Sequence, residues 1–105
     1  MENTIRVNSA RLGDFVGRDV RLVGKLKHLK VDHAIIESVD GGQVEVRIPS
    51  KTNLVDTYVE VVGSVIDSGT MKYKGCSNFG TELDMKLVNE ATELMHDPRF
   101  KDAFM

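Results

Sequence analysis

Two long segments of alternating apolar and polar residues each carry a glycine near their centre, and they limit the fold more than any other feature. Residues 18–30, RDVRLVGKLKHLK, contain Gly24, and residues 57–69, TYVEVVGSVIDSG, contain Gly63. Alternation with a period of two predicts strands with one buried face. Because a glycine inside a strand marks a bend or a bulge, we expect both strands to bend at their glycines.

The alternation also predicts which side chains of the first strand point inward and which point outward. The predicted inward residues are Val20, Leu22, Gly24, Leu26 and His28. The predicted outward residues are Arg21, Val23, Lys25 and Lys27.

Further strands are predicted on either side of the 57–69 segment. Residues 33–49, HAIIESVDGGQVEVRIP, form a hairpin, because Asp40-Gly41-Gly42 supplies the positive φ angles that a tight turn needs. Residues 70–80, TMKYKGCSNFG, form a fifth strand after the turn at residues 67–69. The chain therefore contains five short strands in succession.

The segments between and before these strands complete the predicted fold. Residues 50–56 form a connector with room for one helical turn, and residues 3–17 form an extended arm and a helical turn capped by Asn8 or Ser9. Five strands, two of them bent, fit a small closed barrel of the OB-fold type, in which a helix can lie between strands three and four. An open five-stranded sheet is the alternative.

Residues 84–98, DMKLVNEATELMHDP, are predicted to form an amphipathic helix. Asp84 is a suitable N-cap, and Asp97-Pro98 stops the helix. A continuous apolar stripe is formed by Leu87, Val88, Ala91, Leu94 and Met95. The predicted polar face holds Lys86, Asn89, Glu90, Glu93 and Asp97. We expect Asn89→Ala or Glu93→Ala to have almost no effect on association of the helix with a partner.

The apolar stripe either packs on the chain's own barrel, plugging one end, or docks on a partner. A helix of this length is marginal alone in water, so the stripe must pack on something. The heptad-like spacing, with small Ala91 at the centre, suits close helix–helix approach. The strands already supply enough apolar residues for a small core, and Phe100 and Phe104 would add a second apolar face. These features favour a partner.

Composition narrows the class of protein. The 105 residues suffice for one domain, and no run of about 18 apolar residues predicts a membrane span. The single cysteine, Cys76, allows no internal disulfide, which suits a reducing compartment. Residues 1–30 carry a net charge of +4, whereas residues 31–81 and 82–105 carry −3 each. A dedicated nucleic-acid binder usually shows a strong basic excess, which is missing here.

No constellation of side chains predicts catalysis, a metal or a cofactor. His28, His33, His96 and Cys76 lack metal-ligand spacing, and Cys76 has no evident base partner. The Asp-Gly-Gly stretch is turn chemistry, because no Lys-Ser or Lys-Thr pair and no helix follow it. We therefore expect a protein that is not an enzyme and carries no cofactor.

Single-stranded nucleic acid is bound by OB-folds through aromatic side chains in a basic groove. The sequence has six aromatic residues, and none lies in the second or third predicted strand, the usual binding surface. At most we expect a weak, salt-sensitive, sequence-blind contact. The residues that would make it are Arg21, Lys25, Lys27, Lys72 and Lys74.

Three segments, taken in order, resemble one family over nearly the whole chain, from about residue 6 to residue 100. They are RVNSARLGDFVGRDVRLVGKL at residues 6–26, VEVVGSV at residues 59–65 and LVNEATELMHD at residues 87–97. The chain resembles the smallest subunit of replication protein A, the eukaryotic heterotrimer that binds single-stranded DNA. The resemblance implies an OB-fold followed by a C-terminal helix.

In that family the terminal helix joins one helix from each of the large and middle subunits in a three-helix bundle. The resemblance thus implies a mainly structural role, with a barrel at residues 1–81, an assembly helix within residues 82–105, and DNA bound chiefly by the other two subunits. It implies roles in DNA replication, repair and recombination in the nucleus. The implied bundle residues are Leu83, Leu87, Val88, Ala91, Leu94 and Met95.

Two other functions remain open on the sequence. A small OB-fold component of a telomere-capping complex can share the fold and the helix, and only its partners would distinguish it. A free-standing single-strand binder would bind tightly alone, which the charge balance disfavours.

Overall fold

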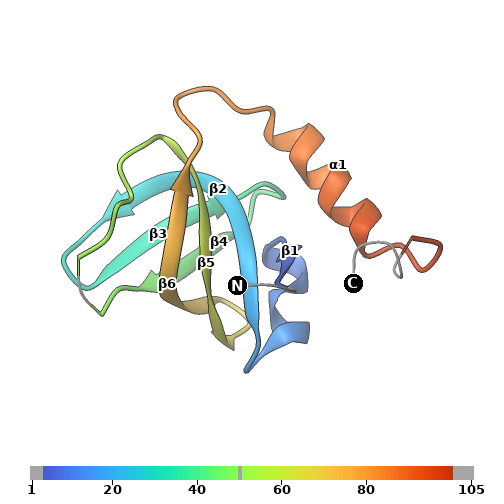
Figure 1. Cartoon of the computed structure of the whole chain (residues 1–105), viewed down its shortest axis with the longest axis horizontal. Helices are drawn as coiled ribbons and strands as arrows, with labels where there is room; N and C mark the ends of the chain where they lie inside the picture. The colour runs from blue at the N-terminus through green and yellow to red at the C-terminus, as the bar shows by residue number, and fades with distance from the viewer. Residues whose placement is uncertain (1–3, 50, 101–105) are drawn as a thin grey trace.

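The computed structural model describes residues 4–49 and 51–100. In this part of the chain six strands form one sheet, accompanied by a 3₁₀ helix and an α-helix (Figure 1). In chain order the elements are β1 Ile5–Val7, the 3₁₀ helix η1 Ser9–Phe15, β2 Asp19–Leu29, β3 His33–Ser38, β4 Gln43–Arg47, β5 Tyr58–Asp67, β6 Thr70–Asn78 and α1 Met85–Met95.

Five of the strands close into a barrel. β2 pairs antiparallel with β5 through residues 19–25 and with β3 through residues 24–29. β3 pairs with β4, β4 runs parallel to β6, and β6 pairs with β5, so the ring returns to β2. The closed barrel is therefore confirmed, and the open sheet is wrong. β1 lies outside this ring and pairs parallel with β2.

The two mid-strand glycines stand where the strands must approach each other closely. Gly24 pairs with Val59 of β5 and with Ser38 of β3, so β2 passes from one neighbour to the other at this residue. A Cβ at Gly24 would collide with the backbone carbonyl of Glu37, and one at Gly63 with that of Lys72. The predicted bend at Gly24 is confirmed, and β5 carries a bulge between Val62 and Gly63.

The hairpin turn and the opening arm also form as predicted. Gly41 adopts a φ of 94°, and the backbone N–H of Ser38 donates to Gly42 O at 2.7 Å. Asn8 caps η1, because its side chain accepts from the backbone N–H of Arg11.

The connector between β4 and β5 contains no helical turn within residues 51–56, so that prediction is wrong. The side-chain oxygen of Asn78 accepts from the backbone N–H groups of Val55 and Asp56 at 3.1 and 3.2 Å. These donors are thereby satisfied without helical bonds. Leu54, which is almost fully buried, joins the barrel core instead.

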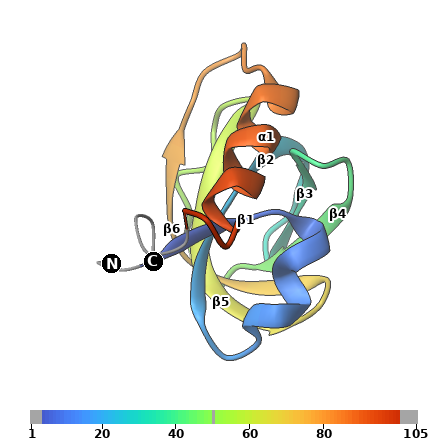
Figure 2. The ribbon, with the colours of Figure 1, turned by 90° about the vertical axis from the view of Figure 1, so that its right-hand side faces the viewer.

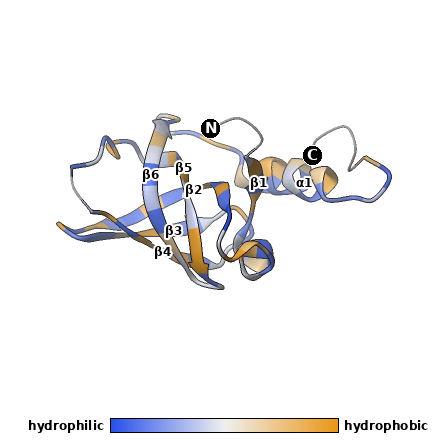
Figure 3. Cartoon of the chain, turned by 60° about the horizontal axis from the view of Figure 1, so that its bottom comes forward, coloured by the Kyte–Doolittle hydropathy of each residue, from blue (hydrophilic) through white to orange (hydrophobic). Residues whose placement is uncertain are grey.

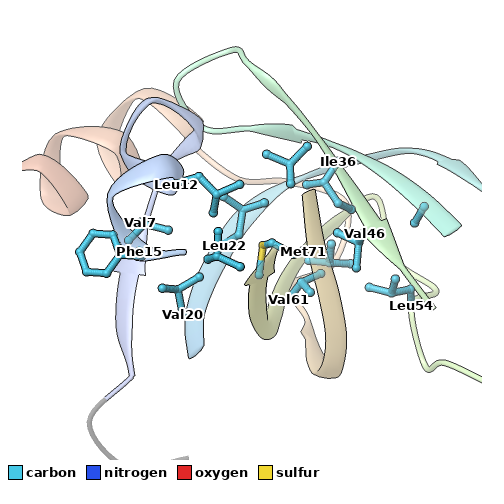
Figure 4. Close-up of a cluster of buried hydrophobic side chains, with 14 of the residues drawn as sticks. Val7, Leu12, Phe15, Val20, Leu22, Ile36, Val46, Leu54, Val61 and Met71 are labelled. Atoms are coloured by element: carbon cyan, nitrogen blue, oxygen red, sulfur yellow. The ribbon is translucent and has the colours of Figure 1, made fainter. Parts of the chain in front are cut away.

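The inward faces of the strands and of η1 form one core (Figure 4). Along β2, Val20 and Leu22 point into it and half-buried Leu26 packs against it, as predicted, but His28 is exposed. A register shift between Leu26 and His28 explains the difference, because it breaks the alternation. Val23, predicted to face solvent, is fully buried although it lies outside the core cluster.

The helix α1 lies beside the barrel, next to β1 (Figures 1 and 2). Asp84 is its N-cap, as predicted, and the Asp84 carboxylate accepts from the backbone N–H of Leu87 at 3.0 Å. No residue of α1 belongs to the barrel core. Of the predicted stripe, Val88 and Met95 are half-buried, whereas Leu87 and Leu94 are exposed, so packing on the chain's own barrel does not account for those two leucines. Phe100 is exposed, and Phe104 lies outside the described residues.

Candidate assembly interface on the C-terminal helix

An exposed apolar face runs along α1 on the side away from the barrel. Leu87 is 61% exposed, Leu94 is 45% exposed, and Ala91 is exposed between them. Their spacing of i, i+4 and i+7 places all three on one face of the helix. Figure 3 shows hydrophobic residues on α1, outside the strands that enclose the core. We call Leu87, Ala91 and Leu94 the outer stripe.

The structure divides the six residues that were predicted to form the interface. Leu87, Ala91 and Leu94 form the outer stripe. Val88 and Met95 are half-buried at its inner margin, and Leu83 is half-buried in the segment that leads to the helix. Thr92, which was not predicted, is the one fully buried residue of α1, and its hydroxyl donates to Val88 O at 2.9 Å. Thr92 therefore marks the face that packs against the rest of the chain.

The predicted polar face is only partly solvated, and this corrects the expectation for Asn89 and Glu93. The Asn8 amide nitrogen donates to Asn89 Oδ1 at 2.8 Å and to Glu93 Oε2 at 2.7 Å. Arg11 donates from Nε and from its terminal nitrogen to the two Glu93 oxygens, both at 2.8 Å. The apolar pattern of α1 could not reveal these bonds, because their partners are more than 80 residues away.

The electrostatic effect of these bonds is large at Glu93. The pKa of its carboxyl falls from 4.5 to about 2, chiefly because Arg11 donates hydrogen bonds to the charged form. The Asn8 amide and the positive charge of Arg11 act in the same direction, and desolvation opposes them. The pKa of Arg11 is raised for the same reason.

A second set of contacts lies near β1 and the C-terminal end of α1. His96 Nε2 donates to the Arg6 carbonyl at 2.9 Å, and the His96 ring meets Phe15 edge-on with centroids 5.8 Å apart. Arg6 in turn pairs with nearly buried Glu60 at 2.6 Å. Glu60 and Val23 are cross-strand partners, so the outer faces of β2 and β5 are covered where these residues meet.

The five basic residues predicted to contact nucleic acid do not all remain free. Arg21 donates to the Thr4 hydroxyl at 2.9 Å, Lys27 pairs with Glu37 at 3.6 Å, and Lys74 pairs with Asp19 at 2.9 Å. Lys25 is half-buried and Lys72 is exposed. Arg47, which the sequence did not place with this group, lies directly beside Lys72 because β4 and β6 pair in parallel, and it pairs with Glu45 at 3.4 Å. Only the topology could reveal that neighbour.

The described part of the chain offers no other site of evident chemistry. No three His, Cys, Asp or Glu residues within residues 4–49 and 51–100 gather where they could hold a metal ion. No aromatic residue lies on β3 or β4. A small pocket between β1 and α1 is lined by Thr4, Ile5, Arg6, Arg21 and Met95. Neither helix in the described residues has the length and apolarity to cross a membrane.

Comparison with known proteins identifies the family. The family model described as replication factor A protein 3 matches residues 1–102. The chain belongs to this family. A 14 kDa replication protein A subunit from Arabidopsis thaliana is 30% identical over 99 residues, which cover 94% of this chain and 92% of that protein. Membership confirms the resemblance to the smallest subunit of replication protein A.

Solved structures agree with the family. A chain in the structure of U. maydis replication protein A bound to ssDNA matches with a TM-score of 0.88 and 30% identity, covering 96% of this chain and 94% of that one. The OB-fold barrel followed by a C-terminal helix is thereby confirmed. The telomere capping protein Ten1 from Saccharomyces pombe matches with a TM-score of 0.74 over 89% of this chain and 97% of its own. At 10% identity, that match shows a shared fold alone.

Proposed function

We propose that this chain is a non-catalytic structural subunit of the replication protein A complex, and that α1 helps to hold the heterotrimer together. The observation that carries the proposal is the outer stripe, which exposes Leu87 and Leu94 on a face that the barrel leaves uncovered. An apolar stripe that stays exposed to water does not stabilise a monomer, whereas a helical partner would bury it. Membership in the replication factor A protein 3 family supports a partner within the replication protein A complex.

The partners are the large and middle subunits, each contributing one helix to a three-helix bundle. Residues 82–105 form the assembly segment, and residues 1–81 form the barrel and its arm. Leu87, Ala91 and Leu94 lie at the centre of the contact, and Val88, Met95 and Leu83 border it. The small side chain of Ala91 lets a partner helix approach closely.

The chain acts in DNA replication, repair and recombination in the nucleus, and single-stranded DNA is bound through the complex. Its own contribution to DNA binding is weak and sequence-blind, through Arg21, Lys25, Lys27, Lys72 and Lys74. The absence of aromatic residues from β3 and β4 supports this division of labour, because stacking is what gives OB-folds tight single-strand binding.

A telomere-capping complex is the second candidate for the assembly to which this chain belongs, because the chain shares its fold with Ten1. The much lower identity to Ten1 than to replication protein A makes it the weaker candidate.

The test is capture of the full-length chain from a native extract of its source, with mass spectrometry of the proteins that accompany it. We expect the large and middle subunits of replication protein A in comparable amounts. Capture of telomere-capping subunits in their place would favour the second candidate. Recovery of the chain alone would contradict both.

A further inference from the structure

The buried amide of Asn8 connects three parts of the chain. Asn8 is only 2% exposed, and its Oδ1 accepts from the backbone N–H of Arg11, which caps η1. Its Nδ2 donates to Asn89 and to Glu93, one turn apart on α1. Both donor hydrogens and the acceptor of this amide are therefore used, and two of its three bonds reach the helix.

Arg11 holds the same helix in a second way. Its guanidinium meets Glu93 in a two-pronged pair, with both nitrogen–oxygen distances at 2.8 Å. A planar fork on a carboxylate fixes direction as well as distance. Asn8 and Arg11 thus constrain both the position and the rotation of α1. We call the bonds among Asn8, Arg11, Asn89 and Glu93 the polar latch.

The latch lies beside the fully buried Thr92 and on the opposite side from the outer stripe. The bond from His96 to the Arg6 carbonyl secures the end of the same helix. The helix has 11 residues, a length at which α-helices are marginal in water. Its exposed leucines do not hold it on the barrel, so the orientation of α1 depends on its inner face and on the latch.

We infer that Asn8 and Arg11 are positioning residues that set the rotation of α1 before any partner binds, so that the outer stripe is already presented. This inference rests on the proposed function for what binds the stripe. A pre-oriented helix loses less conformational freedom on association, and partner helices therefore bind more tightly. In the absence of the latch, the same apolar residues could turn toward β1.

Charge reversal and charge exchange between Arg11 and Glu93 test the inference. Three variants of the full chain are compared: Arg11→Glu, Glu93→Arg and the double exchange. Glu90→Arg is the matched control, because Glu90 is exposed on the same helix and takes no part in the latch. The measurements are amide hydrogen exchange of α1 in the free chain, the melting temperature of the barrel, and affinity for co-expressed large and middle subunits of replication protein A.

We expect each single variant to speed exchange of the α1 amides by roughly tenfold, the loss expected for hydrogen bonds to a charged group. The barrel should melt as before, and partner affinity should fall several-fold. The double variant should regain a substantial part of the slow amide exchange and of the partner affinity. The control should change neither of these two quantities. Recovery in the charge-swapped variant would show that both effects come from the pair between positions 11 and 93, and an unchanged melting temperature of the barrel would separate them from a loss of general stability.

Unchanged exchange in both single variants would overturn the inference. Faster exchange with unaltered partner affinity would also overturn it, since the latch would then play no part in presentation. Failure of the wild-type chain to bind the two subunits would instead contradict the proposed function. The exchange measurement on the free chain would still decide whether the latch orients the helix.

Discussion

Among the residues that the structure describes, Glu93 has the carboxyl whose pKa is shifted most strongly by its surroundings. Its pKa is lowered to about 2, and the groups that face it are Arg11 and Asn8 from the η1 side and His96 on its own helix, while Asp14 acts on Arg11. A carboxyl whose pKa falls on folding stabilises the native contact above its free pKa of 4.5, and that stabilisation is lost as the pH falls toward about 2.

We therefore predict that α1 stays attached at neutral pH and loosens between about pH 4.5 and 2. An NMR titration of the Glu93 carboxyl and of the α1 amides would follow the change. Other carboxyls also titrate in this range, so the Glu93→Gln variant serves as reference, and the Glu93-dependent part should vanish in it. A Glu93 titration midpoint near its ordinary value would contradict the observed pair with Arg11.

For single residues, the sequence shows which ones can cap a helix or form a turn, but it does not show their distant hydrogen-bond partners. Asn8 or Ser9 was predicted as the cap of η1 because both residue types suit that role, and the structure shows that Asn8 is the cap. Its bonds to Asn89 and Glu93 depend on how α1 folds back, which no local pattern contains. The polar face was predicted correctly for Glu93, which is exposed, but for the same reason its bonds to Asn8 and Arg11 were not predicted.

Among the elements, β2 and β5 show why a strand needs a glycine at its bend. In each case the position that a Cβ would occupy is already taken by a backbone carbonyl of the neighbouring strand, which cannot move aside as a side chain can. Gly75 on β6 differs, because a Cβ there would meet nothing within 4 Å.

We predict that Gly24→Val or Gly63→Val lowers the free energy of unfolding by about 1–3 kcal/mol, the usual cost of overpacking, because the added side chain would push the backbone of the neighbouring strand aside. Gly75→Ala should stay within about 0.5 kcal/mol of the wild type, as is usual for substitutions away from such positions. Chemical denaturation of the three variants measures both. Equal stability of the Gly24 variant and the Gly75 control would show that β2 does not need its glycine.

The elements themselves were largely predictable, and the exceptions have identifiable causes. Alternation and turn residues marked β3, β4 and the turn between them, and Asp84 marked the start of α1. The alternation failed after Leu26, where the β2 register shifts, and the connector formed no helical turn because Asn78 satisfies its backbone donors. Both exceptions arise from pairing with a distant segment.

The whole molecule combines a barrel without stacking residues on its usual binding strands and a helix with an exposed apolar face. Two of the basic residues that could contact DNA, Lys27 and Lys74, already pair with carboxylates, which reduces the positive charge available to phosphates.

We predict that the isolated chain binds single-stranded oligonucleotides weakly, and that binding fades as salt rises. Fluorescence anisotropy across a salt series measures it. Lys25→Glu combined with Lys27→Glu should remove the remaining binding, whereas Lys86→Glu on α1 should not. Nanomolar affinity at physiological salt would contradict the account of the barrel as a structural module.

The most direct test of the central claim places charges in the outer stripe. Leu87→Asp with Leu94→Asp should cost at least about 5 kcal/mol of association, because each buried leucine contributes roughly 1.5–3 kcal/mol and each unpaired carboxylate adds a further penalty. That is a loss of several thousandfold in affinity. Glu90→Ala serves as the control on the polar side of the helix. Asn89 and Glu93 are unsuitable for this purpose, because both belong to the polar latch.

The measurement is co-purification of this double variant with the large and middle subunits of replication protein A, together with thermal melting of the variant chain alone. Because both leucines are exposed in the free chain, the account predicts that the partners are lost while the melting temperature of the barrel is unchanged. Partners that still co-purify, with a large drop in melting temperature, would contradict it.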